Sequence, residues 1–171
     1  MRLGLATLGL SATLLGCAAA REAQSPEHVP DRLAFALPDL RGKIVHPEDL
    51  RGQVVLVDLW ATWCKPCKES LPFYAGLVRR YGKQGFAVLA ISVDEDDEVV
   101  TAAVEKAKLP FTVLRDPRST LPASLELQTM PTLLLLDRQG RVAFVHGGFE
   151  DGDDRLIEKQ VRELVAASAP R

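Results

Sequence analysis

Apolar residues form short runs and helical stripes in alternation along the chain. Residues 54–60 are a β-branched apolar run of strand length, and residues 86–93 are a second run of this kind. Between them, apolar side chains recur at helical spacing, and Gly82 marks the end of this stripe, which consists of Cys67, Leu71, Tyr74, Val78 and Tyr81. A mainly apolar run of this length is typical of a strand buried on both faces, so the pattern predicts a parallel strand–helix–strand unit.

The remaining pattern predicts two more helices and a hairpin. An acidic stretch from Asp94 introduces a helix to about residue 108, with lysines near its end, as the helix dipole favours. Apolar runs at residues 132–136 and 141–146 flank a short turn and predict an antiparallel hairpin. An amphipathic stripe from about Asp153 predicts a closing helix. Parallel and antiparallel pairs together predict an α/β fold with a central mixed sheet flanked by helices.

The N-terminus has the pattern of an export signal. Residues 1–16 contain one positive charge, Arg2, and then a small, apolar run that ends before Cys17. The run is shorter than the roughly 20 residues that a membrane-spanning helix needs, so we interpret it as a secretory leader. The Leu-Leu-Gly-Cys sequence resembles the bacterial lipobox, which implies cleavage before Cys17 and a lipid on that cysteine. Ordinary cleavage at the alanines of residues 18–20 is the alternative, with Cys17 a plain leader residue.

Composition is consistent with one globular domain behind this leader. The chain has 171 residues, 47% hydrophobic and 26% charged, and a small, proline-punctuated stretch follows Cys17. We expect a leader at residues 1–16, the lipidated cysteine and a flexible tether at 17–34, and the domain at 35–168. The formal net charge is −2, or −3 once Arg2 leaves with the leader, which argues against nucleic acid as a partner.

The three cysteines consist of Cys17 and one closely spaced pair, Cys64 and Cys67. The pair directly follows the first predicted strand, where a helix begins, so unpaired backbone N–H groups and the positive end of the helix dipole stabilise a thiolate at Cys64. Pro66 suits the first helical turn, because the N–H group that proline lacks would have no partner there. We therefore interpret Cys64 as a nucleophile and Cys67, one turn inward, as the thiol that resolves a mixed disulfide.

Other uses of the pair fit the sequence less well. A disulfide across three residues closes too small a loop to constrain the unfolded chain strongly. Zinc requires two further ligands, whereas His28, His46 and His146 are far apart in the sequence. Lys68 stands where a haem-attachment motif has histidine. We expect redox chemistry with no metal and no bound cofactor.

The residues around the pair resemble the thioredoxin superfamily. The segment from Val57 to Cys67, with Trp60-Ala61-x-Trp63-Cys64-x-Pro66-Cys67 in it, is similar to that family's active-site segment. Met130-Pro131-Thr132 resembles its cis-proline loop, and the stretch between residues 93 and 130 resembles the extra helical insertion of the membrane-tethered TlpA and ResA type. The resemblance covers roughly residues 35–167. It implies a thioredoxin-like fold with an inserted helical segment between the strand–helix–strand half and the cis-proline hairpin.

The resemblance also assigns roles to two acids. A carboxylate at Asp58, inside a buried strand, is costly and should have a raised pKa. In thioredoxin the matching acid moves the proton of the inner cysteine, which implies that Asp58 accepts or relays the proton of Cys67. Glu95 falls where the tethered reductases place an acid near the cysteines. Acidic residues are also common at the start of a helix, where the helix dipole favours them, and this explains Glu95 equally well. Ser70 stands where the family often has glutamate, which puts any function of that acid in doubt.

Three residues are candidates for the substrate groove. A cis peptide bond before Pro131 would turn the backbone toward Cys64, where the exposed groups of residues 129–130 could pair with an extended peptide. Trp63 and Met130 are the candidate side chains beside this segment. Core packing is the alternative for each, most of all for Met130.

The resemblance implies a thiol-disulfide oxidoreductase of the bacterial cell envelope. It would reduce disulfides in exported proteins, cytochrome c precursors among them, with electrons from a membrane thiol-disulfide carrier. A peroxiredoxin is an alternative, but Val57 and Ala61 stand where that class has proline and threonine or serine. A copper-binding module of the same fold is another alternative, although it usually has a wider cysteine spacing and a placed histidine.

Overall fold

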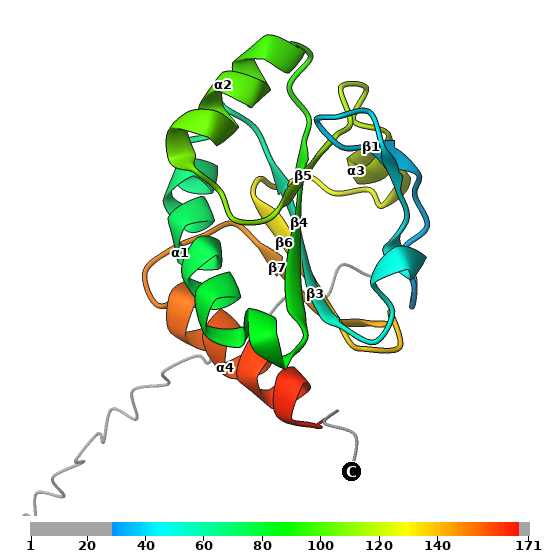
Figure 1. Cartoon of the computed structure of the whole chain (residues 1–171), viewed down its shortest axis with the longest axis vertical. Coiled ribbons are helices and arrows are strands. Elements are labelled where there is room, and N and C mark those ends of the chain that lie inside the picture. The colour runs from blue at the N-terminus through cyan, green and yellow to red at the C-terminus, as the bar shows by residue number, and fades with distance from the viewer. Residues whose placement is uncertain (1–28, 168–171) are drawn as a thin grey trace, which may run out of the picture.

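The computed structural model describes residues 29–167, so the predicted leader, Cys17 and most of the tether lie outside the described residues. A five-stranded sheet of order β5-β4-β3-β6-β7 forms the centre of the domain. In Figure 1, α1, α2 and α4 cover one face of the sheet, and α3 with the β1–β2 hairpin covers the other. The elements in chain order are β1 (Leu37–Pro38), β2 (Ile44–Val45), the 3-10 helix η1 (Pro47–Leu50), β3 (Val54–Trp60), α1 (Lys65–Tyr81), the 3-10 helix η2 (Gly82–Gln84), β4 (Phe86–Ser92), α2 (Asp97–Ala107), β5 (Thr112–Arg115), α3 (Thr120–Ser124), β6 (Thr132–Leu136), β7 (Val142–Gly147) and α4 (Asp153–Ala167).

Strand β3 is the central strand, and all seven of its residues are buried. It pairs in parallel with β4, where Asp58 lies opposite Ala90, and antiparallel with β6, where Asp58 lies opposite Leu133. Strand β6 forms an antiparallel pair with β7. The predicted parallel unit, the predicted hairpin and the mixed sheet are therefore confirmed.

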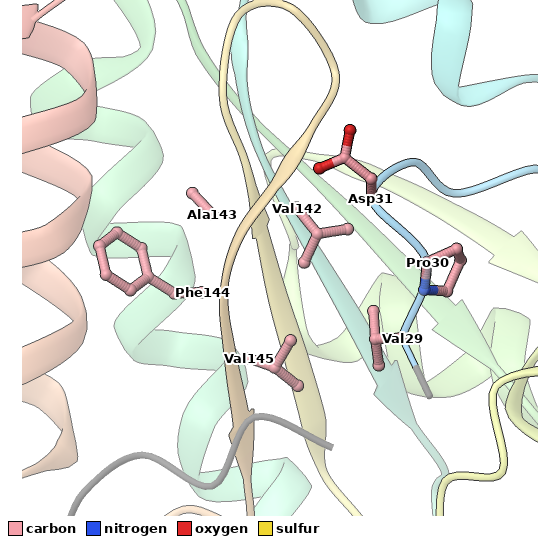
Figure 2. Close-up of a pocket in the computed structure, with 7 residues that line it drawn as sticks. All are labelled: Val29, Pro30, Asp31, Val142, Ala143, Phe144 and Val145. Carbon is pink, nitrogen blue, oxygen red and sulfur yellow. The ribbon is translucent and has the colours of Figure 1, made fainter. Parts of the chain in front are cut away.

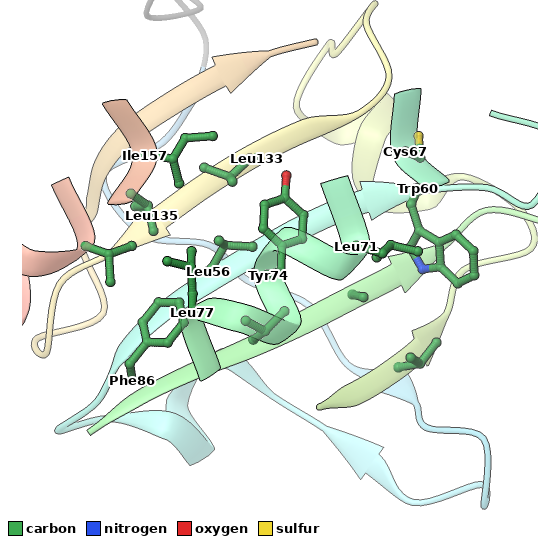
Figure 3. Close-up of a cluster of buried hydrophobic side chains, with 14 of the residues drawn as sticks. Leu56, Trp60, Cys67, Leu71, Tyr74, Leu77, Phe86, Leu133, Leu135 and Ile157 are labelled. Atoms are coloured by element: carbon green, nitrogen blue, oxygen red, sulfur yellow. The ribbon is translucent and has the colours of Figure 1, made fainter. Parts of the chain in front are cut away.

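The side chains of β3 divide between two apolar layers, because successive residues of a strand point to opposite faces. Leu56 and Trp60 belong to the cluster beneath α1, α2 and α4, which Figure 3 shows. Val57 and Leu59 belong to the cluster on the other face of the sheet. Asp58 lies between Leu56 and Trp60 in this alternation, so its carboxyl group faces the layer beneath α1.

The stretch between residues 93 and 130 contains a strand as well as helices. Strand β5 pairs in parallel with β4 and forms an edge of the sheet. It has only four residues, too few to form a recognisable periodic pattern in the sequence. Helix α2 begins at Asp97, three residues later than expected, because the side chain of Asp96 accepts the N–H groups of residues 98 and 99 and caps the helix.

The packed domain begins slightly before residue 35, within the segment expected to be tether. Arg32 forms an antiparallel bridge with Arg141, and the N–H group of Val142 donates to the carbonyl of Asp31 at 2.9 Å. Leu33 is only 2% exposed and packs in the cluster that contains Val57. These contacts attach residues 31–33 to the edge strand β7.

A buried carboxylate fixes the turn between β3 and α1. Asp94, 6% exposed, lies directly after β4 and accepts two hydrogen bonds from Thr62, one from its N–H group at 2.9 Å and one from its hydroxyl at 2.7 Å. The hydroxyl of Ser92 donates to the same carboxylate at 2.8 Å. The guanidinium of Arg115, at the end of β5, donates to the carbonyl of Asp94 at 3.0 Å. The turn that precedes Cys64 is thereby connected to the ends of two other strands.

The substitution Asp94→Ala should destabilise the domain by about 1–3 kcal/mol, because it leaves the N–H and hydroxyl groups of Thr62 and the hydroxyl of Ser92 without their acceptor. Urea unfolding monitored by tryptophan fluorescence measures the change. The matched control is Glu95→Ala at the next, exposed position, where we expect a change within about 0.5 kcal/mol. Equal unfolding midpoints for the two variants would contradict the role assigned to Asp94.

Candidate active site at the start of helix α1

The paired cysteines lie where β3 turns into α1. Cys64 is the N-cap residue of the helix and Cys67 lies in its first turn. The two Sγ atoms form a disulfide, with a distance of 5.3 Å between the Cα atoms. The N–H group of Cys67 donates to Sγ of Cys64 at 3.2 Å. The structure therefore joins the two sulfurs that the sequence analysis paired.

The local geometry distinguishes the two sulfurs. Cys64 receives the N–H group of Cys67 and the positive end of the α1 dipole, and both stabilise negative charge on its Sγ. The residue before it, Trp63, is 68% exposed, whereas Cys67 is fully buried. Cys64 is 6% exposed, so it is the more accessible cysteine of the pair, and Cys67 lies in the apolar layer beneath α1.

Asp58 is fully buried, and neither of its carboxyl oxygens has a hydrogen-bond partner within residues 29–167. Burial raises the pKa of Asp58 well above its ordinary range, and the nearby Tyr74 hydroxyl lowers that pKa in part. The strand neighbours of Asp58 in β4 and β6 are the apolar residues Ala90 and Leu133. The group can therefore hold a proton at a pH where an exposed aspartate has lost it.

Two further polar residues, which the sequence analysis did not assign to the site, lie on the same face of α1. The hydroxyl of Ser70, a fully buried residue, donates to the carbonyl of Cys67 at 3.0 Å. Tyr74 is 1% exposed and was expected only as an apolar member of the helix stripe. The signal was present in the spacing, because positions 67, 70 and 74 are three and four residues apart and share one helix face.

Two of the three candidate groove residues, Met130 and Pro131, directly precede β6. The peptide bond between Met130 and Pro131 is cis, as the resemblance implied. Thr132 lies opposite Leu59 in the sheet, so Pro131 is placed near the end of β3 from which the cysteine turn departs. Pro131 is buried, and its carbonyl accepts the N–H group of Gly148 at 2.7 Å. Met130 is half-buried and packs against the cluster that contains both cysteines. It therefore makes the core contact that the sequence analysis gave as the alternative to a role in the groove.

Glu95 is exposed in the loop between β4 and α2. The acid that the structure connects to the cysteine turn is its neighbour Asp94, through Thr62. The sequence alone does not distinguish the two, because Asp94 is the first of five consecutive acidic residues and its partners come from other elements.

A pocket elsewhere on the domain contains none of these residues. It lies at the outer edge of β7 and is lined by residues 29–31 and 142–145 (Figure 2). Within residues 29–167, no cluster of three or more histidine, cysteine, aspartate or glutamate side chains has the arrangement of a metal site. None of the helices that the structure describes is both long enough and apolar enough to cross a membrane.

Comparison with known proteins gives consistent matches to disulfide-exchanging proteins. The sequence profile of the AhpC/TSA family matches residues 27–145. The thiol-disulfide oxidoreductase ResA of Bacillus cereus is 32% identical over 129 residues, which are 75% of this chain and 69% of that protein.

Solved structures agree with the sequence matches. A Chlorobium tepidum structure described as a thiol:disulfide interchange protein DsbE is 33% identical, with a TM-score of 0.77 over 82% of this chain and 99% of that one. A thiol-disulfide oxidoreductase from Bacteroides fragilis is 27% identical, with a TM-score of 0.69 over 79% of this chain and 99% of that one. With the cysteine pair at the start of α1, these matches show that the chain belongs to the AhpC/TSA family and is a thiol-disulfide oxidoreductase with a thioredoxin-like fold.

Proposed function

We propose that this protein reduces disulfides in exported proteins, cytochrome c precursors among them, from the outer side of a bacterial membrane. The observation that carries the proposal is the asymmetry of the pair: Cys64 is the N-cap residue, next to the exposed Trp63, and is 6% exposed, whereas Cys67 in the first helical turn is 0% exposed. One sulfur is placed to meet a protein substrate, and the other is placed to release it.

The reaction has two exchange steps. In the first, the Cys64 thiolate attacks one sulfur of the substrate disulfide, a mixed disulfide forms, and the other substrate sulfur leaves as a thiolate that takes a proton from solvent. In the second, Cys67 gives its proton to Asp58 and attacks Sγ of Cys64. The Cys64–Cys67 bond forms, the bond to the substrate breaks, and the released thiolate takes up a proton. The substrate gains two electrons and two protons, and the cysteine pair is oxidised.

The groove for the substrate chain consists of Trp63, Met130 and Pro131 in this proposal. Trp63 offers a large apolar surface next to Cys64, since it is 68% exposed. The backbone of residues 129–130 precedes the edge where β6 meets β3, so an extended peptide could lie along it and pair with its polar groups. Glu95 stays a proposed acid near the cysteines, and its exposure limits it to a role at the surface.

The location and the electron supply rest on the N-terminal sequence and on the chemistry. The leader at residues 1–16 and the cysteine at position 17 support export and attachment to a membrane through a lipid. After each cycle the Cys64–Cys67 disulfide must be reduced again. A membrane thiol-disulfide carrier is the proposed donor, because it would face the tethered domain.

The variant Cys67→Ser should trap substrates, because it lacks the thiol that resolves the mixed disulfide with Cys64. Produced as the full chain in its own host, it should give disulfide-linked adducts on non-reducing gels, and mass spectrometry identifies the trapped proteins. The matched control, Cys64→Ser, should trap none of them. Equal adducts in both variants would contradict the assigned order of attack, and adducts restricted to cytoplasmic proteins would contradict the proposed location.

The reduction potential of the cysteine pair tests the proposed direction of electron flow. We expect a reduction potential of about −270 mV, which is typical of reducing proteins with a Cys-x-x-Cys motif. Equilibration of the protein in dithiothreitol or glutathione buffers, followed by mass counting of alkylated thiols, gives the potential. A value near about −120 mV would identify an oxidant and overturn the proposed direction.

The variant Asp58→Asn should slow resolution of a mixed disulfide at Cys64, because asparagine cannot accept the Cys67 proton. The expected loss is on the order of 10²-fold at a pH above the raised pKa of Asp58, where the wild-type carboxylate is ionised. Below that pKa the wild-type group is protonated, so the two rates should converge as the pH falls. Stopped-flow release of glutathione from Cys64 measures the rate, with Asp154→Asn at an exposed position of α4 as the control. Equal rates across the pH range would remove Asp58 from the mechanism.

A further inference from the structure

The face of α1 that packs on the sheet contains an unusual set of polar groups. Cys67, Ser70 and Tyr74 occupy it at helical spacing, with exposed fractions of 0%, 0% and 1%. Asp58 faces the same layer from the central strand and is also fully buried. Figure 3 shows Tyr74 and Cys67 within this layer, together with the apolar side chains that surround them. Four polar side chains thus share a space from which water is largely excluded.

The hydroxyl groups of Ser70 and Tyr74 are the potential hydrogen-bond donors of this set. Ser70 donates its hydroxyl to the carbonyl of Cys67 at 3.0 Å. Burial raises the pKa of Asp58, and the nearby Tyr74 hydroxyl opposes this effect and lowers that pKa. The structure has the disulfide closed, and in it neither oxygen of Asp58 is within hydrogen-bond distance of a partner in residues 29–167. The tyrosine hydroxyl is therefore a donor beside an acid that still has both acceptor sites free.

The residues of the neighbouring strands do not compete with Tyr74 as hydrogen-bond donors to Asp58. The strand neighbours in β4 and β6 are Ala90 and Leu133. On β7, His146 lies opposite Leu133, but its Nε2 pairs with the side chain of Gln160 on α4 at 2.7 Å.

Two charged groups complete the surroundings. Burial raises the pKa of Tyr74 well above its ordinary value, and the charges of Asp58 and of Asp153 on α4 raise it further. The tyrosine therefore keeps its proton and stays a hydrogen-bond donor. Arg115, the buried cation of the described chain, binds the loop at Asp94 and Asp97 instead.

We propose that Tyr74 is a positioning residue for proton transfer at Cys67: its hydroxyl donates a hydrogen bond to Asp58 when that carboxyl group is ionised. The proposal rests on the proposed role of Asp58. It adds that the Tyr74 hydroxyl stabilises the ionised form of Asp58, which accepts the Cys67 proton. Burial alone favours the neutral acid, and a donor to the carboxylate opposes burial. The direction agrees with the effect of the tyrosine, which lowers the pKa of Asp58.

The variant Tyr74→Phe tests the proposal because it removes only the hydroxyl. The ring contacts with Phe73, at 5.7 Å between centroids, and with Phe149, at 6.3 Å, stay available to phenylalanine. Glutathione release from Cys64 is measured against pH. Without the donor, Asp58 ionises at higher pH, so we expect the acid limb of the profile to move up by on the order of one pH unit, with about a tenfold lower rate on that limb.

The matched control is Tyr81→Phe. Tyr81 lies on the same helix, but its hydroxyl donates to Glu158 of α4 at 2.9 Å, away from Asp58. This control should leave the acid limb at the wild-type pH. Thermal unfolding of each variant verifies that it is folded, and carboxyl infrared absorption of Asp58 reads its protonation directly.

Comparison of Asp58→Asn, Tyr74→Phe and the double variant distinguishes failure of the Tyr74 proposal from failure of the proposed role of Asp58. If Asp58→Asn resolves as fast as wild type, the proposed role of Asp58 fails and that of Tyr74 fails with it. If Asp58→Asn is slow but Tyr74→Phe keeps the wild-type acid limb, only the role of Tyr74 is overturned. In the Asp58→Asn background, adding Tyr74→Phe should change the rate by less than about twofold. A further large loss there would show that the hydroxyl acts by another route and would also overturn the proposal.

Discussion

Strand β3 has hydrogen-bonded neighbours on both edges and packed layers on both faces, and therefore every one of its side chains is withdrawn from water. Burial of this kind explains the apolar sequence of the strand, and it also makes the single acid within it costly to ionise. The same strand ends at the turn that presents Cys64. One constraint thus places an acid with a raised pKa and a nucleophilic sulfur on the same element.

The difference between the two cysteines follows from the start of α1. A residue at the N-cap lies outside the first helical turn and faces N–H groups that have no partner inside the helix. Cys64 occupies that position, whereas Cys67 is inside the turn and points into the layer beneath the helix. The chemistry of attack and release therefore depends on the register of the helix, because a shift by one residue would remove both sulfurs from these environments.

The turn itself is held by parts of the chain that are distant in sequence. Asp94 accepts both polar groups of Thr62, and Arg115 binds the backbone of Asp94 from the end of the edge strand. On the other side, the segment before β6 approaches the end of β3 through the antiparallel register. Strand ends from three different chain segments thus define where the first sulfur lies, which keeps a two-sulfur site in one geometry through repeated exchange.

The sequence by itself determined the central strand–helix–strand unit, the later hairpin, the mixed sheet, the cysteine pair at a helix start and the cis bond before Pro131, since each depends on a local period or a short motif. It did not predict the four-residue strand β5. It did not separate Asp94 from Glu95, and it assigned Tyr74 only to the apolar stripe. Those distinctions depend on which side chains meet across elements, such as Thr62 with Asp94 and Tyr74 with Asp58. Only the tertiary structure decides such meetings, because burial and hydrogen-bond partners are properties of the packed chain and have no local period.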